Sequence, residues 1–334
     1  MEKFSAYRDR GSGIAPFLPI PPEPAGVYLP FHIFLFLIRI PFLLAFSLTY
    51  FFFLQWLPIG AIGKKASLWS ILGVPGIWWI DLQIDGVRRG TVNSQKDRFP
   101  QAGSIIAASS TSAIDPLYLA AIFDPIFTAS YPTTRQVRRV GLLEAVSRSF
   151  FHPQTTPPEG AEMLDLQTLT AQSPKRYVVV FPECTTSNGR AILPFSPSLL
   201  SASSKTKVYP VSLRYTSPDI TTPIPHTYFT FLWNLCSKPT HCIRTRIAEY
   251  VYNPANMQGT SRTTAIDTTD VSSEAETLVG SDEENGMNQE ERAFLDKIAE
   301  ALARLGRVKR VGLGVKEKQD FIAMWTKSAK QKRK

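Results

Sequence analysis

The chain has 334 residues, of which 44% are hydrophobic and 19% charged, and this excludes a protein that is disordered throughout. Its net charge of +9 favours an anionic partner, such as a membrane surface, a phosphate ligand or nucleic acid. Cys184, Cys236 and Cys242 are too scattered for a disulfide framework and form no zinc-binding spacing with the four histidines. We therefore expect no structural metal and no bound cofactor.

The first 80 residues predict an attachment to a membrane. Residues 1–29 are a polar, Pro-rich lead-in, and residues 30–57 form an apolar run of 28 residues whose only formal charge is Arg39. A helix of that length reaches about 42 Å, against a hydrocarbon core of about 30 Å. The run therefore predicts a helix embedded in the membrane and long enough to span the bilayer. Alternatively, a kink at Pro41 would divide it into a hairpin within one leaflet, with Arg39 near the interface.

A second apolar stretch, 66–80, is too short and too interrupted by glycine and proline to cross a bilayer. Its tryptophans, Trp69, Trp78 and Trp79, suit the headgroup boundary. Lys64 and Lys65, between the two apolar stretches, would meet anionic lipid on the cytosolic face. We therefore expect a membrane-embedded segment over 30–80.

Residues 81–257 have the pattern of an α/β domain, in which short β-branched runs alternate with helical and loop segments. The candidate strands are 104–108, 177–181, 207–213 and 245–252. A helix is expected over 116–129 with an interruption at Pro125. The proline inside the strand from 207 predicts an edge or strand-end position.

The remaining chain divides by charge. Nine acidic residues and no basic ones lie between Thr263 and Glu291, and residues 258–289 have too little apolar content to offset their chain entropy, so they predict a disordered acidic insert. Helical periodicity over 290–305 predicts a C-terminal helical segment, 290–326. Residues 327–334 form a basic tail, which would bind anionic lipid or act as a retrieval signal of the Lys-x-Lys-x-x kind.

Two polar segments that follow predicted strands are the candidate sites. In SSTSAIDPLYLA, 109–120, Asp115 precedes a proline and would also serve as an ordinary helix cap. In FPECTTSNGR, 181–190, a carboxylate at Glu183 is followed by hydroxyl side chains and a glycine. Such a loop can cradle a phosphate or a developing oxyanion. A surface turn at Asn188–Gly189 explains the same residues equally well.

The order of these features resembles the lysophosphatidic acid acyltransferase type of glycerolipid acyltransferase. It is an apolar run, then the Asp115 segment, then the FPE block at 181–183, and then the YPV strand from 209. FPECTTSNGRAIL is similar to the FPE block of the lysophosphatidylcholine acyltransferase branch. The opening YRDRGSGIAPFLP and the late ARLGRVKRVGLGV resemble a fungal lysophosphatidic acid:oleoyl-CoA acyltransferase subgroup that is also linked to vacuolar sorting. The resemblance covers roughly residues 1–257 and 290–325.

The resemblance implies an α/β fold, with a mixed sheet flanked by helices, and an apolar tunnel for the acyl chain. It implies transfer of a fatty acyl group from acyl-CoA, as co-substrate, to lysophosphatidic acid or a related lysophospholipid. The implied partners are these substrates and membrane lipids, and not nucleic acid. The implied location is the endoplasmic reticulum membrane or a lipid droplet, with the catalytic domain in the cytosol.

One departure bears on catalysis. The family's His-x-x-x-x-Asp motif falls on Ser110 to Asp115, so a serine stands where the family's histidine takes the proton from the acceptor hydroxyl. Loss of a general base typically costs about 10²- to 10⁴-fold in rate. The resemblance assigns Asp115 to orientation or base work and Ser110 to a hydrogen bond with the acceptor. The alternative is a catalytically silent lipid-binding factor in trafficking.

The missing base leaves several substitutes open: His152, His226, a carboxyl with a raised pKa (Asp115 or Glu183), or the phosphate of the acceptor. The implied phosphate cradle consists of Glu183, Thr185, Thr186, Asn188 and Gly189. Thr186 stands where many relatives carry arginine, so Arg190 is the predicted charge clamp. Arg148 is a candidate match to the family's Gly-Phe-Ile-Asp-Arg block.

Overall fold

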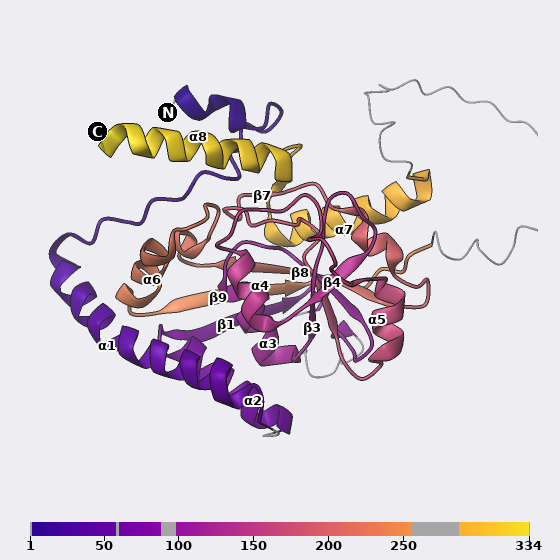
Figure 1. Cartoon of the computed structure of the whole chain (residues 1–334), viewed down its shortest axis with the longest axis horizontal. Coiled ribbons are helices and arrows are strands. Elements are labelled where there is room, and N and C mark those ends of the chain that lie inside the picture. Colours follow the sequence, from indigo (N-terminus) through magenta and orange to yellow (C-terminus); the bar gives the residue numbers. More distant parts are fainter. Residues whose placement is uncertain (1, 58–59, 88–97, 255–286, 334) are drawn as a thin grey trace, which may run out of the picture.

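The computed structural model describes residues 2–57, 60–87, 98–254 and 287–333. It has three parts (Figure 1): two apolar helices along one side, a central sheet with helices on both faces, and a layer in which the two ends of the chain meet. The predicted acidic insert falls almost entirely outside the described residues, because only 287–289 of it are placed.

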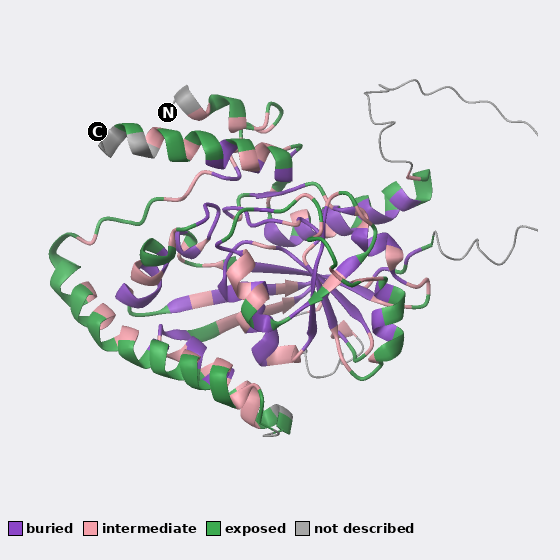
Figure 2. Ribbon diagram, in the orientation of Figure 1, coloured by how far each residue is buried: buried purple, intermediate pink, exposed green. Residues whose placement is uncertain are grey.

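The apolar run forms helix α1 (Leu29–Leu48), which continues into the π-helical segment η3 (Thr49–Leu54). Within the described ranges, Gly26–Leu54 is the one helix long and apolar enough to cross a membrane, and only 6% of its apolar window is buried. Figure 2 shows α1 exposed along most of its length. The helix continues through Pro41, so a hairpin that turns at this residue is wrong. Helix α2 (Gly60–Gly73) packs against both α1 and η3.

The central sheet has eight strands in the order β1-β9-β8-β2-β6-β3-β4-β5. The strands are β1 (Ile77–Ile84), β2 (Ile105–Ala108), β3 (Ile126–Ala129), β4 (Val137–Val140), β5 (Met163–Leu164), β6 (Val178–Val180), β8 (Val208–Tyr215) and β9 (His241–Ile247). The pairs β2–β8, β2–β6 and β3–β6 are parallel. The pairs β8–β9, β3–β4 and β4–β5 are antiparallel. The predicted mixed α/β sheet is therefore confirmed.

Helices cover both faces of this sheet because its central strands are apolar on both sides. In β2, Ile106 and Ala108 belong to one core cluster and Ile105 and Ala107 to another. The first cluster is shared with α1 and α2 and with α3 (Ile114–Phe123), α4 (Leu142–Arg148) and α6 (Tyr228–Ser237). The second is shared with α5 (Leu166–Gln172), the 3₁₀ turn η6 (Pro197–Ser201) and α7 (Gln289–Gly306).

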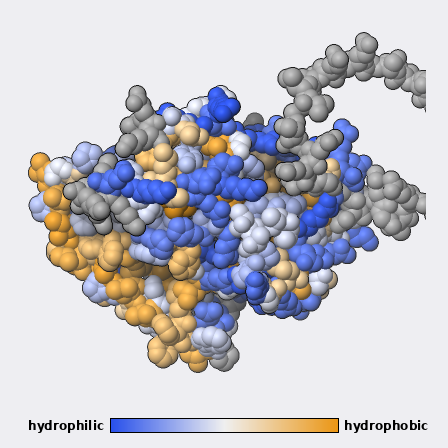
Figure 3. Space-filling model, turned by 45° about the horizontal axis from the view of Figure 1, so that its top comes forward, coloured by the Kyte–Doolittle hydropathy of each residue, from blue (hydrophilic) through white to orange (hydrophobic). Residues whose placement is uncertain are grey.

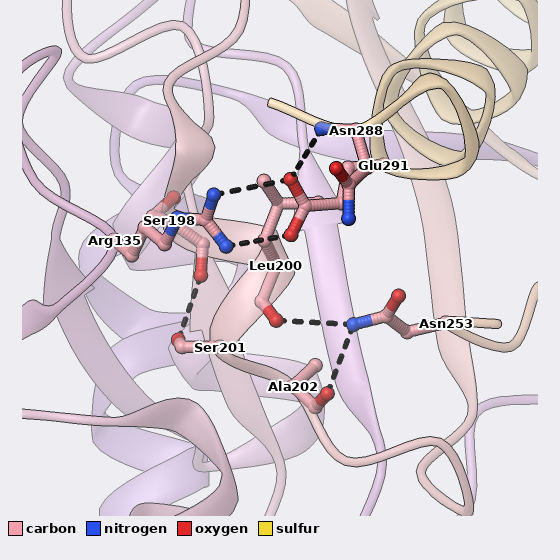
Figure 4. Close-up of polar contacts among 8 residues, drawn as sticks. All are labelled: Arg135, Ser198, Leu200, Ser201, Ala202, Asn253, Asn288 and Glu291. Atoms are coloured by element: carbon pink, nitrogen blue, oxygen red, sulfur yellow. Dashed lines mark hydrogen bonds and ion pairs between the residues drawn. The ribbon is translucent and has the colours of Figure 1, made fainter. Parts of the chain in front are cut away.

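Polar contacts fix the start of α7 beside η6 (Figure 4). Arg135 donates two hydrogen bonds to the carboxylate of Glu291, at 2.6 and 3.0 Å, and the same carboxylate accepts from the backbone N–H of Asn288 at 3.0 Å. Asn253 donates to the carbonyl groups of Leu200 and Ala202 at 3.0 and 3.1 Å. Asn288 and Glu291 thus form a capping box at the predicted C-terminal helix.

The two ends of the chain form a layer above β7 (Ala191–Ile192), a short strand that pairs in parallel with β10 (Lys309–Arg310). The 3₁₀ helix η1 (Glu2–Tyr7) lies beside α8 (Val315–Arg333) (Figure 1). The rings of Phe4, Tyr7 and Phe17 surround Phe321, with centroids 5.6, 5.3 and 6.1 Å from it. The lead-in is therefore packed near its beginning, and helix α8 continues into the predicted basic tail.

Three local features differ from the expectations. Residues 126–129 are strand β3 and not helix, because Asp124 adopts a left-handed conformation, with φ 47°, that ends α3. Strand β1, which begins inside the second apolar stretch and pairs with β9, was not among the predicted strands. Strand β9 begins at His241, four residues before the predicted strand.

Strand β8, with the YPV sequence, lies inside the sheet and not at its edge. The missing N–H of Pro210 does no harm there, because the antiparallel register with β9 begins at Val211. The carbonyl oxygen of Pro210 still accepts a hydrogen bond from Ala248 at 2.9 Å. A proline is therefore tolerated where one ladder has not yet begun.

Candidate active site

Asp115 closes the loop between β2 and α3. One carboxylate oxygen accepts hydrogen bonds from the backbone N–H groups of Thr111 and Ser112, at 2.7 and 2.9 Å, and from the Thr111 hydroxyl at 3.2 Å. The other oxygen accepts from the hydroxyl of Tyr215, at the end of β8. Both oxygens are therefore occupied, and the carboxylate holds the loop that carries Ser110.

Burial raises the pKa of Asp115 from 3.8 to about 6, against the opposing effect of its hydrogen bonds to Tyr215 and Thr111. The carboxyl group is thus ionised at neutral pH, in agreement with a site at which only donors face it. Tyr215 was not a predicted site residue. The signal was present in the YPV strand, because a strand parallel to β2 brings its carboxyl end to the same edge of the sheet.

Glu183 joins the two predicted loops. One of its oxygens accepts from the backbone N–H of Ser110 at 3.4 Å, and the other accepts from Leu193 at 3.2 Å. The backbone N–H of Ser187 in turn donates to the carbonyl of Ser110 at 3.0 Å. Glu183 is only 1% exposed, and burial raises its pKa from 4.5 to about 8. The two loops therefore meet at Ser110, with Glu183 buried beneath them.

A small polar cavity of about 40 Å³ lies where the loops meet. Its lining includes three predicted residues, Ser110, Thr185 and Thr186. It also includes Arg148, at the end of α4, whose guanidinium lies over the ring of Tyr131 at 5.3 Å. The hydroxyl oxygen of Ser130, another lining residue, is buried without a hydrogen-bond partner among the described residues. The cavity therefore combines hydroxyl groups with one cation.

Other predicted residues lie elsewhere. Arg190 is exposed and is not part of the cavity lining, so Arg148 holds the position at which the sequence suggested Arg190. Asn188 donates from its side chain to the carbonyls of Ala15 and Leu18 at 2.8 and 2.9 Å, and therefore anchors the N-terminal segment. Gly189 adopts φ 71°, a conformation that favours glycine in this turn.

The candidate histidines are also outside this cavity. The rings of His152 and His226 lie against one another, with centroids 5.3 Å apart, and neither residue lines the cavity. Within the described ranges, no group of three or more His, Cys, Asp or Glu side chains is placed to hold a metal ion. The described lining of the cavity supplies hydroxyl groups and the guanidinium of Arg148.

An apolar cavity of about 220 Å³ lies on the other side of the first turns of α3. Ala113, Ile114 and Leu117 line it, whereas Ser110 and Pro116 line the polar cavity. Its remaining walls come from α1, η3, α2, α4 and α6, with contributions from Pro75 and Ile77. Figure 3 shows the hydrophobic surface gathered on one side of the molecule. The polar cavity and the apolar cavity thus both lie beside the first turns of α3.

Arg39 fixes α1 as a wall of the apolar cavity. Its guanidinium donates to the carbonyl groups of Pro75 and Cys236, both at 3.3 Å, to that of Pro239 at 2.8 Å, and to that of Lys238. These carbonyls lie at the end of α2 and the end of α6, where helices leave acceptors unpaired. Arg39 therefore has a structural role between helices, and its position relative to a lipid interface stays a prediction.

The chain is similar in sequence to known proteins over the residues that form this site. A family model described as Acyltransferase matches residues 91–214, which contain Ser110, Asp115, Arg148 and Glu183. This defines the class of protein as an acyltransferase.

Two yeast proteins narrow the class. The chain is 30% identical over 234 residues to a candidate lysophosphatidic acid:oleoyl-CoA acyltransferase of Schizosaccharomyces pombe, with 67% of this chain and 77% of that protein covered. It is 25% identical over 201 residues to lysophosphatidic acid:oleoyl-CoA acyltransferase 1 of Saccharomyces cerevisiae, with 59% and 61% covered. The crystal structure of PlsC, a 1-acyl-sn-glycerophosphate acyltransferase of Thermotoga maritima, is similar at a TM-score of 0.39 and 12% identity, with 81% of this chain and 96% of that chain covered. The chain belongs to the lysophosphatidic acid acyltransferase family.

Proposed function

We propose that the protein transfers a fatty acyl group from acyl-CoA to the free hydroxyl of lysophosphatidic acid, and so forms phosphatidic acid. The observation that carries this proposal is the pair of adjoining cavities at the start of α3, one polar with Arg148 and one apolar. A phosphorylated glycerol with an acyl chain has the same division of chemistry. The names of the two yeast relatives support the choice of acceptor.

Each lining residue has a role in this proposal. Arg148 pairs with the acceptor phosphate, because a guanidinium binds phosphate oxygens in a bidentate geometry. The hydroxyl groups of Ser110 and Thr185 donate to the glycerol and to the oxygen that becomes negative in the transition state. Asp115 and Glu183 hold the two loops in register. The apolar cavity takes the end of an acyl chain.

The proton of the acceptor hydroxyl needs a recipient as the new C–O bond forms and the thioester C–S bond breaks. Asp115 already accepts four hydrogen bonds, and both oxygens of Glu183 accept from backbone N–H groups. We therefore assign this task to the phosphate of the acceptor, which lies on the same molecule as the hydroxyl. The proton then passes to the departing thiolate of coenzyme A.

The test is an assay of the purified protein in vesicles with radiolabelled oleoyl-CoA and either lysophosphatidic acid or monoacylglycerol. The proposal predicts acylation of lysophosphatidic acid and a rate at least about 100-fold lower with the acceptor that lacks a phosphate. Equal rates with the two acceptors would contradict the role of the phosphate. Absence of turnover with every lysophospholipid tried would contradict the proposed function and favour the silent lipid-binding alternative, which the names of the relatives do not support.

The location is part of the proposal. We place the protein in the endoplasmic reticulum membrane or on a lipid droplet, with the catalytic domain in the cytosol. The apolar helix Gly26–Leu54 supports attachment to a membrane, and Lys64 and Lys65, which follow it closely in sequence, favour a cytosolic location of the chain after it. The N-terminal segment packs against α8, with the rings of Phe4 and Tyr7 on Phe321, so the proposal keeps the N-terminus on the same side of the membrane as the catalytic domain and has α1 enter the bilayer without crossing it. A glycosylation acceptor introduced near residue 5 tests this, since modification would place the N-terminus in the lumen and contradict the proposal.

A further inference from the structure

Lys318 is a buried lysine that reaches the polar site from the C-terminal helix. It lies in the first turn of α8, outside the residues matched by the family model, and is only 3% exposed. Its ammonium group donates to the carbonyl oxygen and to the hydroxyl oxygen of Thr186, at 2.5 and 3.0 Å. Both hydrogen bonds thus go to a residue that lines the polar cavity.

This arrangement is costly for the fold. Removing an ammonium from water costs several kcal/mol unless strong partners compensate. Burial accordingly lowers the pKa of Lys318 from 10.5 to about 7, although the charge of Glu183 acts in the opposite direction. The partners that offset this cost interact with the ammonium group itself: the two hydrogen bonds to Thr186 and a cation–π contact with the ring of Phe17, 6.0 Å from the nitrogen. Packing alone therefore gives no reason for a lysine at this position.

The two hydrogen bonds fix the orientation of Thr186. The hydroxyl of Thr186 accepts from Lys318 and donates to the carbonyl of Thr222 at 2.6 Å, so its rotamer is set by partners on both sides. The backbone N–H of Thr222 in turn donates to the carbonyl of Thr111, in the Asp115 loop, at 2.9 Å. Thr186 therefore links the C-terminal helix to both loops of the site.

We propose that Lys318 is a positioning residue for the acyltransferase site: it holds Thr186, and with it the Thr185–Ser187 loop, in the geometry that receives the acceptor. The C-terminal helix is then part of the assembly of the active site. This inference rests on the proposed function, because the acceptor is taken to be lysophosphatidic acid.

The test is a double-mutant cycle between Lys318→Met and Thr186→Val, measured as kcat and KM for lysophosphatidic acid together with the melting temperature. Lys316→Met is the matched control, since Lys316 is exposed on the same helix. The inference predicts that each single change lowers kcat/KM on the order of tenfold, and that the double variant is no worse than the poorer single variant. The control should keep the wild-type value.

Two outcomes would overturn the inference: wild-type kcat/KM in Lys318→Met, or losses that multiply in the double variant. If Lys318→Met does not fold, Thr186→Val decides, because a folded variant with an unchanged kcat/KM would show that the orientation of Thr186 has no effect. If the wild-type protein itself shows no turnover, the proposed function fails. The positioning role is then read from binding of lysophosphatidic acid by thermal stabilisation, which Lys318→Met should weaken on the order of tenfold in Kd.

Discussion

Asp115→Ala is expected to destabilise the protein strongly, whereas Asp115→Asn is expected to be mild. The alanine variant leaves the backbone N–H groups of Thr111 and Ser112 without their acceptor, and both residues are buried. An unsatisfied buried donor costs about 1–3 kcal/mol, so the pair costs about 2–6 kcal/mol. The hydroxyl of Tyr215 also loses its partner, which adds to this cost because the hydroxyl faces the buried Asp115.

Asparagine can replace the hydrogen bonds of Asp115 one for one. Its carbonyl oxygen accepts from Thr111 and Ser112, and its amide group donates to the hydroxyl oxygen of Tyr215. The charge-assisted bonds become neutral, with an expected loss of about 1–2 kcal/mol. Differential scanning fluorimetry of the protein in lipid nanodiscs measures the difference. We expect the melting temperature to fall on the order of 5–15 °C for alanine and by much less for asparagine.

Two results would refute this reasoning. One is an alanine variant that melts within roughly 2 °C of the wild type, because the loop would then not depend on the carboxylate. The other is an asparagine variant as unstable as the alanine variant, because the negative charge, and not the hydrogen bonds, would then hold the loop.

Three further predictions follow from single contacts. Arg39→Met removes the hydrogen bonds between α1 and the ends of α2 and α6, and should lower the free energy of unfolding by about 2–4 kcal/mol. The segment after α1 should then be cleaved in limited proteolysis. Unchanged protection from the protease would contradict the structural role of Arg39. Leu232→Trp partly fills the apolar cavity and should shift preference toward shorter acyl-CoA on the order of tenfold, whereas Phe229→Trp, at an 86% exposed site on the same helix, should not. Because the pKa of Glu183 is raised, the folded state binds more protons than the unfolded state between pH 4.5 and about 8, so the free energy of unfolding falls as pH rises through this window. Glu183→Gln should make this fall less steep between pH 5 and 7. An unchanged slope in the variant would contradict the pKa shift.

The meeting of the two site loops was predictable from the sequence. Each loop follows an apolar strand, and the strands β2 and β6 are parallel neighbours, so their carboxyl ends lie at one edge of the sheet. The apolar helix was equally clear, because its length and lack of charge are local properties. The features that the sequence did not predict depend on partners distant in the chain. Strand β1 forms by pairing with β9. Pro210 is tolerated inside the sheet because the pairing of β8 with β9 begins one residue later, at Val211.

The choice of cation could not be made from the sequence for the same reason. Arg190 follows the FPE block directly and was the natural candidate, but the turn at Gly189 leaves it exposed. Arg148 lies 35 residues before Glu183 and reaches the cavity only because α4 packs against α3 and β3. Lys318 reaches Thr186 across 132 residues of sequence, and no local pattern marks a lysine that becomes buried.

The central claim is that the polar cavity beside Arg148 binds the acceptor phosphate, and the comparison of Arg148→Gln with Arg190→Gln tests it most directly. Steady-state kinetics with radiolabelled acyl-CoA should give a KM for lysophosphatidic acid that rises about 10- to 100-fold in Arg148→Gln, since a hydrogen-bonded charge is lost. Arg190→Gln should behave like the wild type. An unchanged KM in Arg148→Gln together with a large rise in Arg190→Gln would place the acceptor outside this cavity and contradict the account.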